Sequence, residues 1–146
     1  MPLSLQIDVV AHVIQLAIAP VFLLTAVGTL LNVLVNRLSR SVDRRRTLTA
    51  ALPEVDAIIA GAVHAELDYV ERRVRLIYTA IFLAVATALL ICLLIAIAFV
   101  DALLAVDLSQ VVAILFVLAM LALIGSLALF MREVYLGVNT VACPLH

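Results

Sequence analysis

Three long runs of apolar residues dominate the pattern of the chain. They are Val9–Val35, Leu76–Val100 and Val111–Met131, and none contains a formally charged residue. A helix rises about 1.5 Å per residue and the hydrocarbon layer of a bilayer is about 30 Å thick, so roughly 20 residues suffice to cross it. The pattern therefore predicts an all-α integral membrane protein, one membrane domain over residues 1–146, with three transmembrane helices.

Between the first two runs the pattern becomes amphipathic. Apolar residues follow Pro53 at steps of three and four, which is the period of an α-helix: Val55, Ile59, Val63, Leu67, Val70, Val74 and Ile77. Pro53, with Glu54 and Asp56 behind it, is typical of a helix start. We expect one helix from about Glu54 to Val100 and an inward extension of the first span. A turn near Ala50–Pro53 would join them, so residues 37–75 are predicted to form a cytoplasmic, Arg-rich antiparallel helical hairpin.

Composition supports a membrane protein and charge gives its orientation. The chain is 67% hydrophobic and 13% charged, far from the values of a soluble domain, and its net charge of −1 gives no basis for nucleic-acid binding. Eight of the nine basic residues lie in the first connection: Arg37, Arg40, Arg44, Arg45, Arg46, Arg72, Arg73 and Arg75. The charged residues of the second connection are Asp101 and Asp107, and it has no basic residue. Basic residues near span ends stay on the cytoplasmic side, which predicts a multi-pass membrane protein with its N-terminus outside and its C-terminus cytoplasmic.

The arginines have two interpretations. They can act only as a topological anchor, or they can also form the contact with anionic membrane lipids or with a protein partner. Arg132 and Glu133 close the third span, and Glu133 is expected to pair there with Arg37, Arg72 or Arg73 and to tie helix ends together.

One face of the first span is polar. Thr25, Thr29, Asn32 and Asn36 fall within about 60° of arc at 100° per residue. Such a face either packs against other helices or lines a wet pathway. The second span has small residues at every fourth position, namely Ala80, Ala84, Ala88, Cys92 and Ala96. Small residues let helices approach closely, which favours a homo-oligomer.

Catalytic chemistry is not indicated. The sequence has no Gly-rich phosphate loop, CxxC, HExxH or GxSxG motif, and we expect no enzyme, cofactor or metal. His64 and Asp68 share a helix face without a third ligand, so a hydrogen-bonded pair is favoured over a metal site. His12 and Asp8 lie one turn apart at the outer face. Cys92 within a span and Cys143 in the inner tail do not predict a disulfide.

Several stretches resemble a bacterial family of small three-span inner-membrane proteins known as domain of unknown function 2721. They are "IQLAIAPVFLLTAVGTLLNVLVNRLSR", "ERRVRLIYTAI" with "ALLICLLIAIAF", and "LFMREVYLGV". The resemblance runs from about Ile14 to Val138 and is weakest over Thr47–Glu66. The family's recurring residues would here be Pro20, Asn32, Arg37, Asp43, Arg72, Arg73, Arg132 and Glu133. The resemblance implies an integral protein of the bacterial inner (plasma) membrane and implies no activity.

Two functions remain. The favoured one is a homo-oligomeric structural or regulatory membrane assembly whose Arg-rich hairpin meets anionic lipid or a partner. The alternative is an oligomeric channel or solute pathway lined by the polar face of the first span.

Overall fold

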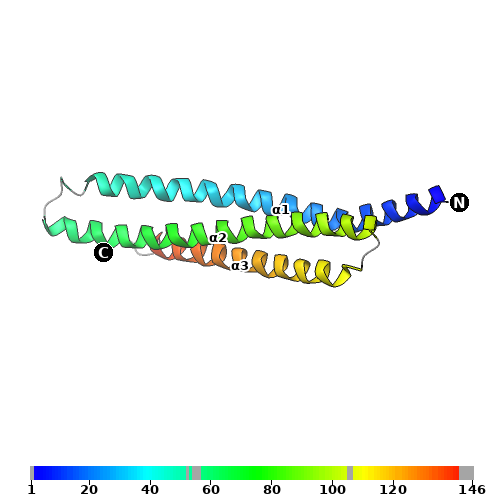
Figure 1. The fold of residues 1–146 in the computed structure, drawn as a ribbon. Coiled ribbons are helices and arrows are strands. Elements are labelled where there is room, and N and C mark those ends of the chain that lie inside the picture. Colours follow the sequence, from blue (N-terminus) through cyan, green and yellow to red (C-terminus); the bar gives the residue numbers. More distant parts are fainter. Residues whose placement is uncertain (1, 52, 54–56, 105–106, 142–146) are drawn as a thin grey trace. The chain divides into compact units, whose positions relative to one another are not determined.

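The computed structural model describes residues 2–51, 53, 57–104 and 107–141, and these form three long α-helices (Figure 1). They are α1 (Pro2–Ala51), α2 (Ala57–Leu104) and α3 (Ser109–Val141). Each contains a stretch long and apolar enough to cross a membrane: Ile18–Ala51, Ile59–Leu104 and Ser109–Gly137. The all-helical prediction with three candidate spans is therefore confirmed.

Proline and aspartate account for the helix ends. α1 ends at Ala51, two residues before Pro53, because proline disfavours helical geometry in the residue that precedes it. The predicted helix start at Glu54 and Asp56 lies outside the described residues, and α2 is described from Ala57. Pro20 lies within α1, which runs helical through it.

Aspartates organise the connection between α2 and α3. Asp101 Oδ1 accepts a hydrogen bond from the Leu108 amide at 2.8 Å. Asp107 Oδ1 accepts the Ser109 hydroxyl at 2.6 Å and the Ser109 amide at 3.4 Å. The Leu108 carbonyl then accepts the amides of Val111 and Val112. These bonds satisfy amides that the first turn of a helix leaves without intrahelical partners, so α3 begins at Ser109.

The chain divides into two compact units. The first comprises Met1–Leu31 and Leu83–Ile124. Its core consists of small and branched side chains, with the hydroxyl of buried Thr87 donating to the Leu83 carbonyl at 2.9 Å. The fully or almost fully buried hydrophobic residues are Val27, Ala84, Ile91, Leu94 and Ala119.

The second unit comprises Asn32–Phe82 and Gly125–His146. Here α1 and α2 pack through a cluster of Leu48, Val70 and Val74, and flanking apolar residues cover it: Leu38, Val42, Val63, Leu67 and Tyr69. α3 joins them where the Ser126 hydroxyl donates to the Ala80 carbonyl at 2.8 Å. The packed residues belong to the apolar stripes seen in the sequence. Their location in the cytoplasm remains a prediction.

Much of the apolar surface is uncovered. Only 17%, 28% and 11% of the most apolar window in the three candidate spans is buried. Phe22, Phe82 and Leu103 are each more than 70% exposed. Soluble monomers rarely leave contiguous apolar surface of this extent open to water, so the exposed apolar surface supports a membrane protein.

Candidate functional site

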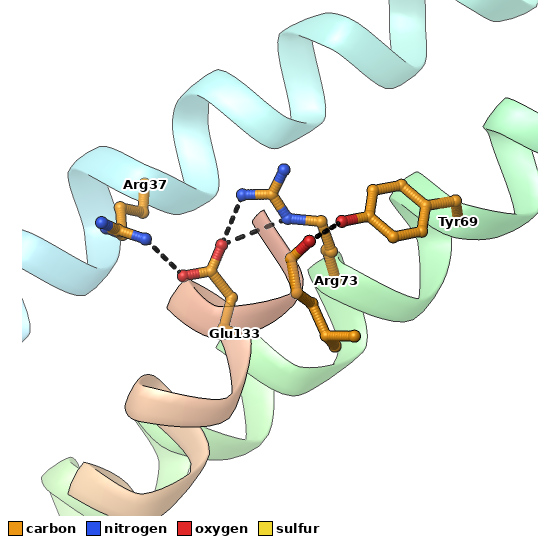
Figure 2. Close-up of polar contacts among 5 residues, drawn as sticks. Arg37, Tyr69, Arg73 and Glu133 are labelled. Carbon is orange, nitrogen blue, oxygen red and sulfur yellow. Dashed lines mark hydrogen bonds and ion pairs between the residues drawn. The ribbon is translucent and has the colours of Figure 1, made fainter. Parts of the chain in front are cut away.

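A buried carboxylate lies at the centre of the second unit. Glu133, on α3, is 1% exposed. It is buried because α1 and α2 both pack against this end of α3, and both of its oxygens are bound. Oε2 accepts Arg37 Nη1 of α1 at 2.5 Å, and Oε1 accepts Arg73 Nη2 of α2 at 2.5 Å and Nε at 3.2 Å. Figure 2 shows Glu133 between the two arginines, so one side chain ties all three helices together.

The two arginines are held by aromatic rings as well as by the carboxylate. The Arg37 guanidinium lies 5.2 Å from the ring centroid of Phe130, and that of Arg73 lies 5.9 Å from that of Tyr69. These distances suit cation–π attraction. Because 31% of the Arg37 and 27% of the Arg73 side chain remains exposed, both guanidinium groups also reach the surface.

Tyr69 and Gly137 complete the contact between α2 and α3. The Tyr69 hydroxyl donates to the Leu136 carbonyl at 2.6 Å (Figure 2). A Cβ placed at Gly137 would come within 3.3 Å of Arg73 Nη2. A glycine is therefore the residue that lets the guanidinium lie directly against α3.

Four arginines line one cleft next to the contact between α2 and α3. Its volume is about 370 Å³, and it is lined by Arg37, Arg40, Ser41, Arg44, Val70, Arg73, Val134 and Gly137. We call it the arginine cleft. Arg44 also pairs with Glu66, which is not among the lining residues, through Nη2 at 2.5 Å and Nε at 3.0 Å. The four arginines together with Glu66 and Glu133 carry a formal net charge of +2, so the cleft favours anions.

The remaining arginines named from the sequence lie apart from the arginine cleft. Arg45, Arg46 and Arg132 are exposed. Arg72 and Arg75, also exposed, line a second cleft with Tyr69 and the acids Asp68 and Glu71. Opposite charges balance within this second cleft, so the cleft itself is not an anion site, but both guanidinium groups remain exposed at the surface. Glu133 thus meets Arg37 and Arg73, and Arg72 lies elsewhere.

The polar residues of α1 turn away from the rest of the chain. Thr25 and Thr29 are exposed and bond to carbonyls one turn back, at 3.2 and 3.1 Å. Asn32 and Asn36 are also exposed and bond to each other at 3.4 Å. In the small-residue strip of α2, Ala80 and Ala84 are buried, whereas Cys92 and Ala96 are exposed.

Metal ligation is not evident in the described part of the chain, where no group of three or more His, Cys, Asp or Glu side chains converges. His64 and Asp68 are exposed on α2. The Asp8 side chain and Cys143 lie outside the described residues. The expected proximity of Asp8 to His12, and the expectation that Cys143 forms no disulfide, therefore stay predictions. At the α3 start, the Ser109 hydrogen bonds hold the pKa of Asp107 below its ordinary value.

The spacing of the arginines contains a signal for the cleft. Treating all eight arginines of the first connection as one cluster does not bring it out. Arg37, Arg40 and Arg44 are spaced i, i+3 and i+7, which places them on a single helix face. Arg46 falls on the opposite face at 100° per residue. Ser41, four residues after Arg37, lies on the same face as that arginine. Val134 and Gly137 gave no such signal, because only the packing of α3 brings them into the cleft.

Comparison with known proteins gives a family and no function. No curated protein and no solved structure matches this chain. A family model described as "Protein of unknown function (DUF2721)" matches residues 17–143. This range includes the three candidate spans from Ile18 onward, the arginine cleft and Glu133, and it confirms the resemblance noted in the sequence. The chain is a member of the DUF2721 family.

Proposed function

We propose that this chain is a non-catalytic, homo-oligomeric membrane protein whose inner arginine surface binds anionic phospholipid headgroups. The observation that carries the proposal is the exposure of six of the eight arginines between residues 37 and 75: Arg40, Arg44, Arg45, Arg46, Arg72 and Arg75. An exposed arginine close to an anionic membrane surface contributes about 1 kcal/mol of attraction.

The proposed orientation places these arginines on the cytoplasmic side. Arg37 lies two residues after the end of the first apolar run, Arg73 three residues before the start of the second, and Glu133 two residues after the end of the third. The contacts of Glu133 join these three positions, which supports span ends that lie at one level of the membrane. Basic residues gathered at one level favour the inner face, with the N-terminus outside and the C-terminus inside.

Homo-oligomerisation is supported by what the single chain leaves exposed. Thr25 and Thr29 face away from the other helices while Phe22 is 73% exposed. Polar groups in the hydrocarbon layer are stabilised when a neighbouring helix covers them. A second copy of the chain would provide that cover.

The experiment is lipid binding by the full chain in a mild detergent, measured by native mass spectrometry. Phosphatidylglycerol should be retained in preference to phosphatidylcholine, and replacing Arg45, Arg46, Arg72 and Arg75 together by glutamine should reduce the preference. The same spectra give the oligomer number. Equal retention of the two lipids by the wild-type chain would refute lipid recognition, and a monomer would refute the assembly.

A solute pathway is the second candidate, and the exposed hydroxyls of Thr25 and Thr29 favour it. In a ring of chains these groups would line a central axis, and the arginines at its inner mouth would favour anions. Thr29→Val should then change anion flux in proteoliposomes while the native mass stays the same. Unchanged flux with assembly intact would leave the hydroxyls as contacts between helices.

A further inference from the structure

We propose that the arginine cleft is a specific binding site for a phosphate group. Arg40, which has no hydrogen-bond or ion-pair partner among the described residues, would contact the ligand. This inference rests on the proposed function and narrows it, because it replaces diffuse attraction over the whole surface with one site. The cleft of about 370 Å³ falls in the range of small-ligand sites.

The guanidinium groups explain the choice of phosphate. Arginine presents five N–H donors in a planar fork that matches the oxygens of a phosphate. In the described contacts Arg37 uses one donor and Arg73 two, all on Glu133, while Arg44 uses two on Glu66. Donors therefore remain on every arginine that lines the cleft.

Glu133 prepares the site. It already holds two guanidinium groups on one carboxylate, while part of each stays exposed. Side chains fixed before binding lose little conformational entropy when a ligand arrives, which raises affinity. Val70 and Val134 add apolar side chains to the lining, which suits the first carbons of the acyl chains that lie near the phosphate of a phospholipid.

Arg40 is the residue that separates this site from general attraction. It is exposed and lines the cleft, and it has no hydrogen bond or ion pair with another described residue. Arg46 is likewise exposed and without a partner among those residues, but it lies on the opposite face of α1 and does not line the cleft. Arg40→Gln and Arg46→Gln remove the same charge from the same helix, so they form a matched pair.

A second matched pair tests the shape of the site at constant charge. Ser41 lines the cleft, whereas Ser39 is exposed on the same helix outside it. Ser41→Leu should fill the space next to the arginines, and Ser39→Leu should leave it open. Only a ligand that enters the cleft distinguishes these two variants.

The experiment titrates the full chain and its variants with phosphatidylglycerol and phosphatidic acid in native mass spectrometry, with phosphatidylcholine as reference. A parallel arm adds inorganic phosphate and follows the shift in thermal unfolding. Arg40→Gln should weaken binding of the anionic lipids about tenfold, the usual effect of losing one charge-assisted hydrogen bond, and Arg46→Gln less than about twofold. Ser41→Leu should reduce binding and Ser39→Leu should not.

The outcomes separate the two proposals and the two sources of phosphate. Equal losses in Arg40→Gln and Arg46→Gln would overturn the site and leave the proposed lipid surface intact. No preference of the wild-type chain for anionic lipid or phosphate over phosphatidylcholine would overturn both. An Arg40-dependent response to lipid alone supports a headgroup ligand, and an Arg40-dependent response to inorganic phosphate alone supports a soluble one.

Discussion

Removing Glu133 and removing its two arginine partners should lower the free energy of unfolding by different amounts. The three variants are Glu133→Met, Arg37→Met with Arg73→Met, and all three changes together; methionine keeps an unbranched apolar chain in each place. Glu133 is 1% exposed, while the two arginine side chains are 31% and 27% exposed. Without Glu133 the guanidinium groups can turn to water, but without the arginines the carboxylate cannot.

The magnitudes follow from that difference. A buried charge left without its partner destabilises a fold by about 3–5 kcal/mol, which applies to the double arginine variant. Glu133→Met loses charge-assisted hydrogen bonds whose donors regain water, so we expect about 1–2 kcal/mol. The triple variant removes every charge at once, and apolar replacement of a buried ion group is often neutral or better. Its free energy of unfolding should lie within about 1 kcal/mol of the wild type.

Steric trapping in lipid bicelles measures that free energy for the full chain without a denaturant. The order of destabilisation should be double arginine variant, then Glu133→Met, then triple variant. Additive effects, with the triple variant the least stable, would show that the three groups do not act as a unit. A loss below about 1 kcal/mol in the double arginine variant would show that water reaches Glu133.

Three further results are expected. Ser126→Ala removes the bond to the Ala80 carbonyl and should lower the free energy of unfolding by about 1 kcal/mol, whereas Ser126→Leu should lower it more because the site is fully buried. The lowered pKa of Asp107 means that its carboxylate stabilises the fold above its ordinary pKa of 3.8, and this contribution is lost as the pH falls below that value; Asp107→Asn should flatten that part of a pH–stability profile. In a chain whose native cysteines are replaced by serine, Arg46→Cys should react with a membrane-impermeant thiol reagent only from inside and Asp107→Cys only from outside, and the reverse pattern would invert the proposed topology.

The three candidate spans and the packing of α1 on α2 followed from the sequence because each rests on a local pattern of apolar residues. Uncharged apolar runs of more than 20 residues are typical of helices that cross the hydrocarbon layer of a bilayer. The stripe through Val63, Leu67, Val70 and Val74 shows one helical face, and the structure packs that face on α1. α1 ends at Ala51, where a turn near Ala50–Pro53 was expected. The expected start of the next helix lies outside the described residues, and the bonds of Asp107 at the start of α3 were not predicted.

The arginine cleft was less accessible because it depends on the register of α3. The sequence indicated that Glu133 would meet an arginine of the first connection, but three candidates were equivalent by spacing. Arg73 and Arg72 are neighbours in sequence and lie about 100° apart on α2. The packing of Tyr69 on Leu136 and the absence of a side chain at Gly137 bring Arg73 to Glu133. Which arginine pairs with Glu133 is therefore decided only when all three helices are packed together.

An arginine that serves only to orient a membrane protein has no preferred helix face, because the retention of basic residues depends on their number and their side of the membrane. Arg45, Arg46 and Arg75 satisfy that requirement from exposed positions. Arg37, Arg40 and Arg44 meet it too, but they share one face, and that face opens on a cleft where Glu133 buries a carboxylate against two of the four guanidinium groups. Burial of a carboxylate costs free energy that orientation alone does not require. Its effect is to fix Arg37 and Arg73 in place beside Arg40, so the residues that we propose to orient the chain are also the ones that we propose to bind a phosphate.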